Sequence, residues 1–372
     1  MGRDSLFGEN VVWSGRPKLL TVPPLFRWAA IVFAVVAVST TMSAITVATV
    51  IGGGVGYLLL FAAWMATLAL ACWRLPIWWR SELEYIITDR NIRLRRRRLR
   101  RFLSRHEVSF ARIKWDRTHT DIGDLELVRA VPTGALRRRI TLTLSGIVAP
   151  DRVWAFVRGV TPAAPAGDGH RLLAQRLDEG ERVLWSAHPL PHWSRWVPTN
   201  ARGVLSLLLG LSLVLSALVA GGDAFRSLRT VVRGGLQPGS VSFVTLVLSV
   251  TLSVALLGAA AVFVVYASVV KPARLLGRTR YLITDRRVLI QQGSEELHLE
   301  RTRIVDVIDA PGAGDSRHLF LVLDGPKARA FAPSGAFGEE PQGPGLQPVL
   351  RLIEDADVAQ RILKEDQSAI AA

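Results

Sequence analysis

Residue types that can do chemistry are spread through this sequence without a pattern that would bring them together. His188 and His192 stand four positions apart, but Pro189 and Pro191 prevent the helix that would place both rings on one face. No nucleophile elbow, Walker loop or pair of carboxylates stands out, and the lone Cys72 cannot form a disulfide. The remaining histidines have no partner spaced for metal binding: His106, His119, His170, His298 and His318. We therefore expect no enzymatic activity, no metal site and no cofactor.

The one dense set of polar side chains is basic. Eight arginines fall within thirteen residues: Arg93, Arg95, Arg96, Arg97, Arg98, Arg100, Arg101 and Arg105. Beside a membrane such a cluster binds anionic lipid headgroups, at about 1 kcal/mol for each arginine. An equally open interpretation is that the cluster only sets membrane topology or forms a solvated hairpin. Nucleic-acid binding is disfavoured because Phe102 is the only aromatic ring in the cluster on which a base could stack.

The cluster follows a segment that is long and apolar enough to cross a membrane twice. The 46 residues between Arg27 and Arg74 carry no charge, and a bilayer of about 30 Å needs roughly 20 residues for each helix. The glycines of residues 52 to 56 predict a turn between two helices, not a phosphate-binding loop. Trp28 at one mouth and three tryptophans at the other fit an aromatic belt at headgroup level, the three being Trp73, Trp78 and Trp79.

A second apolar pair follows later in the chain, in residues 203 to 222 and 241 to 270. For the residues between them we expect either a short helix lying on the membrane surface, with Phe225 set against Arg226 and Arg229, or a solvated loop. None of the four spans contains an aspartate, glutamate, lysine, arginine or histidine, which argues against a secondary transporter. The sequence thus predicts four transmembrane helices in two hairpins.

Two motifs occur twice and tie the halves of the chain together. Residues 8 to 17 match residues 180 to 189 at a separation of 172, and residues 85 to 90 match residues 281 to 286 at a separation of 196. The second copy therefore carries 24 additional residues between its motifs, a pattern that indicates duplication of one long unit. The residues that carry the repeat are Trp13, Pro17, Tyr85, Thr88, Asp89 and Arg90, and Trp185, Pro189, Tyr281, Thr284, Asp285 and Arg286.

Each apolar pair is followed by strand-like segments and one short helix. In the first unit the strands are expected around residues 85 to 94, 106 to 115, 125 to 130 and 139 to 147, with a helix from Pro150. In the second they are expected around residues 281 to 291, 297 to 308, 319 to 323 and 349 to 353, with a helix from Asp357. Short strands followed by one helix predict a small sandwich or barrel with a helical plug.

The pattern Tyr-x-Ile-Thr-Asp-Arg-Arg-Val-Leu-Ile, which runs from Tyr281 to Ile290, is preceded by a Glu-x-Val-Leu-Trp-Ser-x-x-Pro segment and a two-helix hairpin. With this order of motifs the chain resembles the bacterial pleckstrin-homology-like family of membrane proteins, and the resemblance extends over most of both units. It implies two seven-stranded β-sandwiches, each capped by a C-terminal helix, but no activity and no binding residue. The first unit departs from the family after Arg90, where an Arg-rich insertion is expected in place of a short turn.

The fold class predicted is therefore an α+β membrane protein with four transmembrane helices and two pleckstrin-homology-like domains. Its expected function is non-enzymatic binding or scaffolding at the bacterial inner membrane, with anionic lipids and a membrane protein as partners and no nucleic acid. An accessory subunit of an export or channel assembly is the alternative. Both termini and both β-domains are expected in the cytoplasm. The expected segments are 1–27 (N-terminal, cytoplasmic), 28–73 (transmembrane hairpin), 80–160 (β-domain), 161–168 (linker), 169–202 (helix and Trp-Ser segment), 203–270 (transmembrane hairpin) and 276–366 (β-domain).

Overall fold

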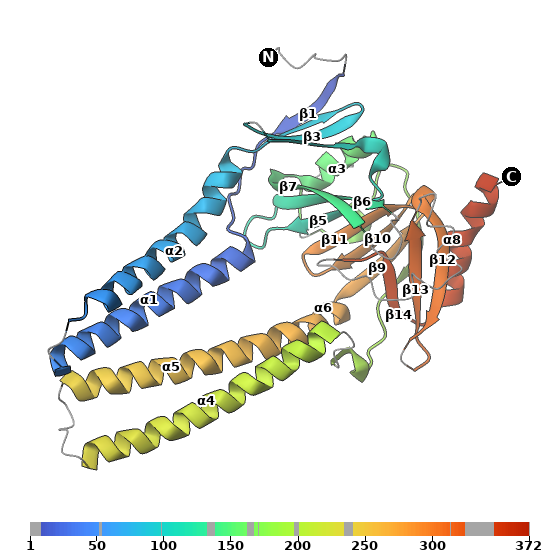
Figure 1. The fold of residues 1–372 in the computed structure, drawn as a ribbon. Helices are drawn as coiled ribbons and strands as arrows, with labels where there is room; N and C mark the ends of the chain where they lie inside the picture. Colours follow the sequence, from blue (N-terminus) through green and yellow to red (C-terminus); the bar gives the residue numbers. More distant parts are fainter. Residues whose placement is uncertain are drawn as a thin grey trace. The chain divides into compact units, whose positions relative to one another are not determined.

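The computed structural model describes residues 9–51, 54–97, 99–131, 138–161, 167–169, 171–196, 201–233, 241–312, 314–323 and 346–371. The chain forms two compact units (Figure 1). A helical unit comprises Thr21–Trp79 and Arg195–Ala273. A β-rich unit comprises Met1–Leu20, Arg80–Ser194 and Arg274–Ala372.

The helical unit contains the four predicted spans. Helices α1 (Pro24–Ile51) and α2 (Gly56–Ser81) form the first pair, and α4 (Ala201–Arg233) and α5 (Val241–Val265) form the second. Each is long and apolar enough to cross a membrane, and most of the side chains in these spans are exposed. The α5 helix continues through a π-helical turn, Tyr266–Val270, into α6 (Lys271–Gly277). The prediction of four candidate membrane helices is therefore confirmed.

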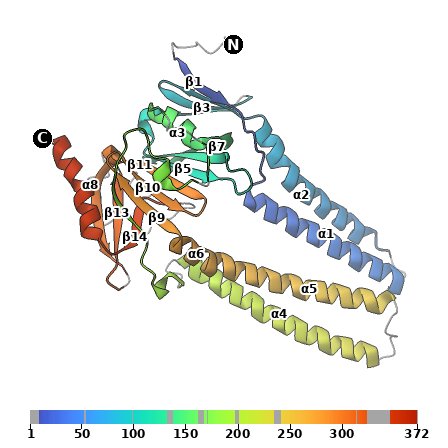
Figure 2. The ribbon, with the colours of Figure 1, turned by 180° about the vertical axis from the view of Figure 1, so that it is seen from behind.

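Helix α5 packs against both α4 and α1. A Cβ atom added at Gly210 of α4 would lie 2.9 Å from Val265 Cγ2, so glycine permits the close approach of α4 to the end of α5. The rings of Trp28 in α1 and Phe263 in α5 lie 4.3 Å apart between centroids. In both views α4 and α5 run side by side (Figures 1 and 2).

The residues added in the second half of the chain extend α4. Neither the separate surface helix nor the loop expected around Phe225 is present, because α4 continues without a break to Arg233. At about 1.5 Å per residue, its 33 residues span about 50 Å, well beyond the hydrocarbon thickness of a bilayer. The last turns of α4 therefore carry their arginines, including Arg226 and Arg229, past the candidate span Gly203–Asp223.

The β-rich unit has two halves. The first half comprises seven strands and helix α3 (Pro150–Arg158). Its strands are β1 (Val11–Gly15), β2 (Glu84–Thr88), β3 (Asn91–Arg96), β4 (Leu99–Ser104), β5 (Phe110–Trp115), β6 (Ile122–Val131) and β7 (Arg138–Val148).

The second half comprises seven further strands in the described residues and helix α8 (Ala356–Ala371). Its strands are β8 (Val183–Ala187), β9 (Thr279–Thr284), β10 (Arg287–Gln292), β11 (Glu295–Glu300), β12 (Ile304–Pro311), β13 (Arg317–Leu323) and β14 (Val349–Ile353). The predicted closing helices are present, and every predicted strand segment contains a strand, although residues 85–94 form two strands and β4 lies in no predicted segment.

Both halves use the same antiparallel order in their first four strands. In the first half this order is β1-β2-β3-β4, and in the second the neighbours run β8-β9-β10-β11. Trp13 lies opposite Ile87, and Trp185 lies opposite Ile283, after a register shift at the same point of each first strand. The Trp-Ser motifs are thus edge strands of the sheets. This differs from the expected boundaries, which left residues 1–27 and 169–202 outside the β-domains.

The two halves share one sheet. Strand β11 pairs with β5, so β5, β6 and β7 join β8 to β11 in a single seven-stranded sheet, while β12, β13 and β14 form a separate one. Segments 80–160 and 276–366, expected as separate domains, are therefore continuous through backbone hydrogen bonds. Segment 161–168, expected as a linker, lies mostly outside the described residues. The helix expected in 169–202 is not described there: before α4 begins at Ala201, the described residues contain only the short 3-10 turns Leu173–Gln175 and Trp193–Trp196.

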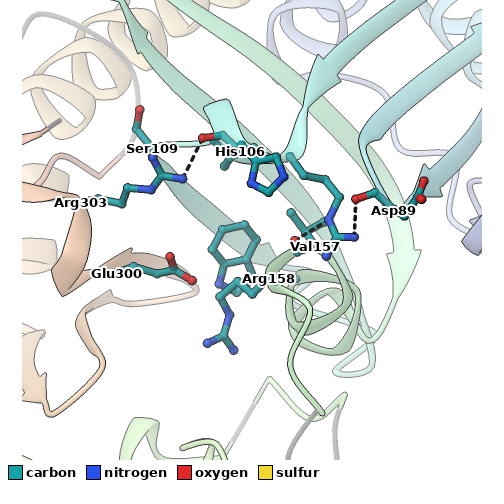
Figure 3. A pocket seen from close by; sticks show the side chains of 10 residues that line it. Asp89, His106, Ser109, Val157, Arg158, Glu300 and Arg303 are labelled. Atoms are coloured by element: carbon teal, nitrogen blue, oxygen red, sulfur yellow. Dashed lines mark hydrogen bonds between the residues drawn. The ribbon is translucent and has the colours of Figure 1, made fainter. Parts of the chain in front are cut away.

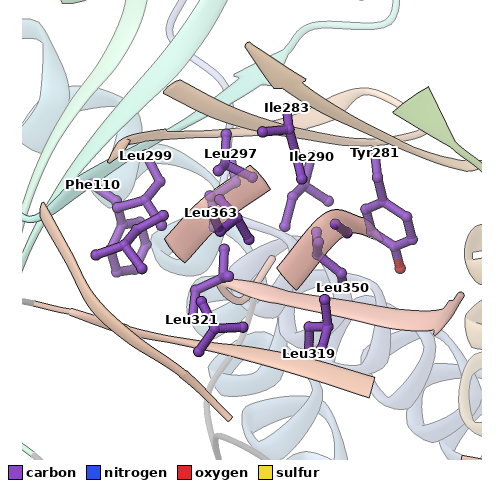
Figure 4. Close-up of a cluster of buried hydrophobic side chains, with 14 of the residues drawn as sticks. Phe110, Tyr281, Ile283, Ile290, Leu297, Leu299, Leu319, Leu321, Leu350 and Leu363 are labelled. Atoms are coloured by element: carbon purple, nitrogen blue, oxygen red, sulfur yellow. The ribbon is translucent and has the colours of Figure 1, made fainter. Parts of the chain in front are cut away.

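Each half has its own hydrophobic core, closed by its helix. The first core includes Trp154 of α3, and the second includes Leu363 of α8 (Figure 4). Phe110 of β5 belongs to the second core although its strand belongs to the first half. Each closing helix has apolar residues on one face, such as Val153 and Val157 of α3, and this face packs against the core of its half.

Candidate functional site

The repeated residues hold the strands and turns of the sheets together. Thr88 Oγ1 accepts the backbone N–H of Asn91 at 2.9 Å and lies 2.8 Å from the Glu9 carboxylate. Thr284 Oγ1 accepts the N–H of Arg287 at 2.9 Å and donates to Glu181 at 2.6 Å. Each Thr-Asp-Arg turn is therefore tied to a glutamate that precedes the Trp-Ser strand. The aspartate N–H groups donate to the same segments, from Asp89 to Asn10 O and from Asp285 to Arg182 O.

The two repeated tyrosines are also structural. Tyr85 Oη accepts the backbone N–H of Ser145 at 3.0 Å, and Tyr281 Oη accepts that of Arg351 at 2.9 Å. Both rings are buried, and burial raises the pKa of Tyr281 to about 12. After Pro17 and Pro189 the chain crosses to the opposite sheet, where Lys18 N donates to Gly146 O and Leu190 N donates to Leu352 O.

Several of the clustered arginines bind other residues of the β-rich unit. Arg105 donates to the carbonyl oxygens of Val157 and Phe156 at 2.9 Å each and of Asp89 at 2.9 Å, so it clamps the end of α3 to the first hairpin. Arg301 performs the same task in the second half, with bonds to Thr284 O and Ile362 O. Arg105, a candidate lipid-binding residue, thus donates to three backbone carbonyl oxygens of its own half.

Three further arginines of the cluster have carboxylate partners. Arg93 forms an ion pair of 2.8 Å with Glu9. Arg96 is buried and forms an ion pair of 3.3 Å with Glu82, which also accepts a hydrogen bond of 2.7 Å from Arg97. Glu82 is the first residue after helix α2, so its carboxylate joins the hairpin to the end of that helix.

Arg95, Arg100 and Arg101 are exposed to solvent on the hairpin. Arg98 lies outside the described residues. Strands β3 and β4 pair with Arg95 opposite Arg100 and with Arg93 opposite Phe102. Since directly opposed residues lie on one face of a sheet, these four side chains share the face that points away from the first core.

The cluster does not contain an insertion. Arg97 occupies the left-handed turn of the first hairpin with φ of 43°, and Gly293, 196 positions later, occupies that of the second with φ of 62°. The two hairpins have equal strand lengths, β3 and β4 matching β10 and β11. The expected Arg-rich insertion is therefore wrong. Sequence alone suggested it because glycine is the usual turn residue and arginine is not.

A buried ionic network, which the sequence did not predict, links the two halves. Arg158 at the end of α3 binds both oxygens of Asp178, at 2.7 and 3.0 Å. Asp178 lies 3.6 Å from Arg287 of β10, whose guanidinium binds Glu181 at 2.8 Å. All four side chains are at most 6% exposed. The network continues through Arg176, Glu296 and His298.

The network controls the protonation of its members. Burial alone would raise the pKa of Glu181, but hydrogen bonds from Arg287 and Thr284 and the charge of Arg287 lower it below its ordinary value. Burial would likewise raise the pKa of Asp178, which Arg158 and Arg287 lower instead. Burial lowers the pKa of His298, and the charge of Arg287 lowers it further against the opposing effect of Glu296. These shifts favour charged carboxylates and a neutral histidine.

A cavity of about 220 Å³ lies where the two halves meet. Its walls include Asp89, His106 and Trp154 from the first half and Glu300 and Arg303 from the second. Figure 3 shows that Arg303 donates to the His106 carbonyl, a bond of 2.8 Å. Because the cationic groups in its walls already hold backbone or carboxylate oxygens, the cavity is a seam between the halves and does not present an open anion site.

The described residues contain no group of three or more histidine, cysteine, aspartate or glutamate side chains placed to hold a metal ion. His188 Nδ1 lies 3.1 Å from Thr279 O, and the ring of His192 lies beside Trp193. Comparisons with protein-family models, with curated proteins and with solved structures found no match. The structure therefore defines the class of the chain by its architecture: an α+β protein with four helices able to span a membrane and a β-rich unit of several sheets.

Proposed function

We propose that the chain is a non-enzymatic protein of the bacterial inner membrane, anchored by α1, α2, α4 and α5, whose β-rich unit binds the cytoplasmic membrane surface. In this proposal its two halves are duplicated pleckstrin-homology-like domains. The equal strand order of β1-β2-β3-β4 and β8-β9-β10-β11 supports duplication, as do the matched tyrosine, threonine and arginine contacts.

The observation that carries the proposal is the pairing of the Arg-rich hairpin with Glu82, the residue that follows α2 in the chain. Glu82 follows Ser81, the last residue of the candidate span Gly56–Ser81, and binds Arg96 and Arg97 at the tip of the hairpin. The hairpin that carries the exposed arginines is therefore bonded to the chain segment that directly follows the candidate span. Anionic headgroups are the partners that such a basic surface attracts there.

The exposed arginines to which we assign lipid binding are Arg95, Arg100 and Arg101. At about 1 kcal/mol each near an anionic surface, these three arginines contribute about 3 kcal/mol, which is about a hundredfold in local affinity. Salt limits the attraction to about 8 Å at physiological ionic strength, so only headgroups close to the hairpin contribute.

The test uses the full chain in nanodiscs of mixed zwitterionic and anionic lipid, followed by extraction and mass spectrometry of the lipids that stay bound. We expect the triple variant R95Q/R100Q/R101Q to retain far less anionic lipid than the parent. The control R117Q/R182Q/R361Q removes three exposed arginines outside the hairpin and makes the same change in net charge. Equal loss in both variants, or in neither, would refute a lipid function for the hairpin.

A further inference from the structure

The outer face of the first hairpin combines charge with an exposed ring. Phe102 is 77% exposed, more than any other large apolar side chain described in the β-rich unit. It lies opposite Arg93, and Arg95 and Arg100 occupy the next opposed pair on the same face. An exposed aromatic side chain gains free energy when a partner covers it, so Phe102 is a candidate contact residue.

In the second half the position that matches Phe102 is buried. His298 stands 196 residues after Phe102, and it is only 3% exposed, within the network of Arg287 and Glu296. The sheet face that the network covers in the second half therefore remains accessible at Phe102 in the first half. The exposed phenylalanine is thus specific to the first hairpin.

The charges on this face select the partner. Two acidic groups on it already have basic partners, since Glu9 binds Arg93 at 2.8 Å and Glu84 lies 3.8 Å from Arg16. Arg95 and Arg100 add positive charge around Phe102. Two positive side chains beside an exposed ring match a partner that presents phosphate groups above an apolar layer. An anionic bilayer presents both.

We propose that Phe102 inserts into the headgroup region of the anionic membrane in which the chain is anchored, while Arg95 and Arg100 contact lipid phosphates on either side. This inference rests on the proposed membrane-surface function and extends it, because it assigns the apolar anchor to a residue outside the set of arginines. Glu82, which binds Arg96 and Arg97 of the hairpin, directly follows the candidate span in the chain, so the chain between span and hairpin is short.

The test places a nitroxide spin label on Phe102→Cys in a Cys72→Ser background, with the full chain in nanodiscs. Accessibility to oxygen and to a water-soluble nickel chelate reports whether the label is in lipid or in water. We expect the oxygen-to-nickel accessibility ratio at position 102 to rise several-fold in anionic nanodiscs compared with zwitterionic ones. Val358→Cys, on α8 and 44% exposed, is the matched control and should stay in water in both.

The outcomes separate the two proposals. A label that remains accessible to nickel in anionic nanodiscs refutes insertion, while the proposed lipid function stands if R95Q/R100Q/R101Q still loses anionic lipid. A label that becomes immobile without gaining oxygen access shows that a protein covers Phe102, and it also refutes insertion. If the label is in lipid and the triple variant retains its anionic lipid, Phe102 anchors the hairpin without help from the arginines, which overturns the role proposed for Arg95 and Arg100.

Discussion

At the scale of single residues, the two buried tyrosines make the same bond in both halves. Removing the hydroxyl of Tyr85 or Tyr281 leaves a backbone N–H, of Ser145 or Arg351, without its acceptor. We expect Tyr85→Phe and Tyr281→Phe each to lower the free energy of unfolding by about 1 to 3 kcal/mol. Thermal unfolding in mild detergent measures the effect. Tyr57→Phe, at a position 71% exposed in α2, serves as the control and should change little; an equally large effect there would contradict the explanation.

A second residue, His298, makes stability depend on pH. Its pKa in the folded protein lies below the ordinary value of 6.5, so the unfolded chain binds the proton more readily. The stability that the neutral ring contributes is complete above pH 6.5 and is lost as the pH falls through the folded pKa. The lowered pKa values of Glu181 and Asp178 act with the same sign, but only below their ordinary values of 4.5 and 3.8.

We therefore expect the unfolding temperature of the parent to fall as the pH is lowered from about 6.5 toward about 5, with a smaller change in His298→Asn. Asparagine keeps an acceptor for Arg287, which lies 3.2 Å from His298 Nδ1, but it does not titrate. Unfolding temperatures across this pH range, for both proteins in the same detergent, provide the measurement. Parallel curves would show that the acid sensitivity originates elsewhere.

At the scale of elements, the first hairpin depends on a carboxylate outside its own strands. Glu82→Gln removes the charge that faces the buried Arg96, and removing a carboxylate from a buried cation is costly. We expect a loss of about 2 kcal/mol in unfolding free energy, because Glu82 is 22% exposed and glutamine still offers an oxygen acceptor. Glu84→Gln is the matched control, because its partner Arg16 has a side chain 75% exposed and such pairs contribute less than about 1 kcal/mol.

Hydrogen exchange adds a local measurement for the same element. Amides of β3 and β4 should exchange faster in Glu82→Gln than in the parent, while those of β10 and β11 should not change. Uniform acceleration across both hairpins would mean that Glu82 supports the whole unit and not the first hairpin alone.

At the scale of the whole molecule, positive charge predicts the orientation in the membrane. Basic residues flank the first helix pair at its two outer ends, while the turn between α1 and α2 has none. We expect a fluorescent reporter fused after Ala372 to be active in the cytoplasm and an alkaline phosphatase fused at the same point to be inactive. The arginines at the end of α4 oppose this orientation, so removing Arg226, Arg229 and Arg233 should strengthen it. An active phosphatase at the C-terminus would reverse the proposed topology.

Much of this architecture could be predicted because its signals are local. A stretch of 46 uncharged residues is long enough for two membrane helices whatever surrounds it. The strands and the closing helices α3 and α8 follow from apolar spacing and from turn residues within each segment. The repeated motif Thr-Asp-Arg predicted a turn in both halves, and each turn is present.

The tertiary structure decided what the local signals leave open. Pairing of β5 with β11 joins residues about 180 positions apart, and no periodicity within either strand specifies its neighbour. Clustering alone could not separate Arg105, a clamp on α3, from Arg100, an exposed side chain, because the difference depends on carbonyl groups more than 50 positions away. The sequence by itself therefore determined the four candidate membrane helices, the two closing helices and most of the strands. Only the fold decided which charges are buried with partners and which remain on the surface, since the cost of burying a charge depends on the groups that long-range packing brings beside it.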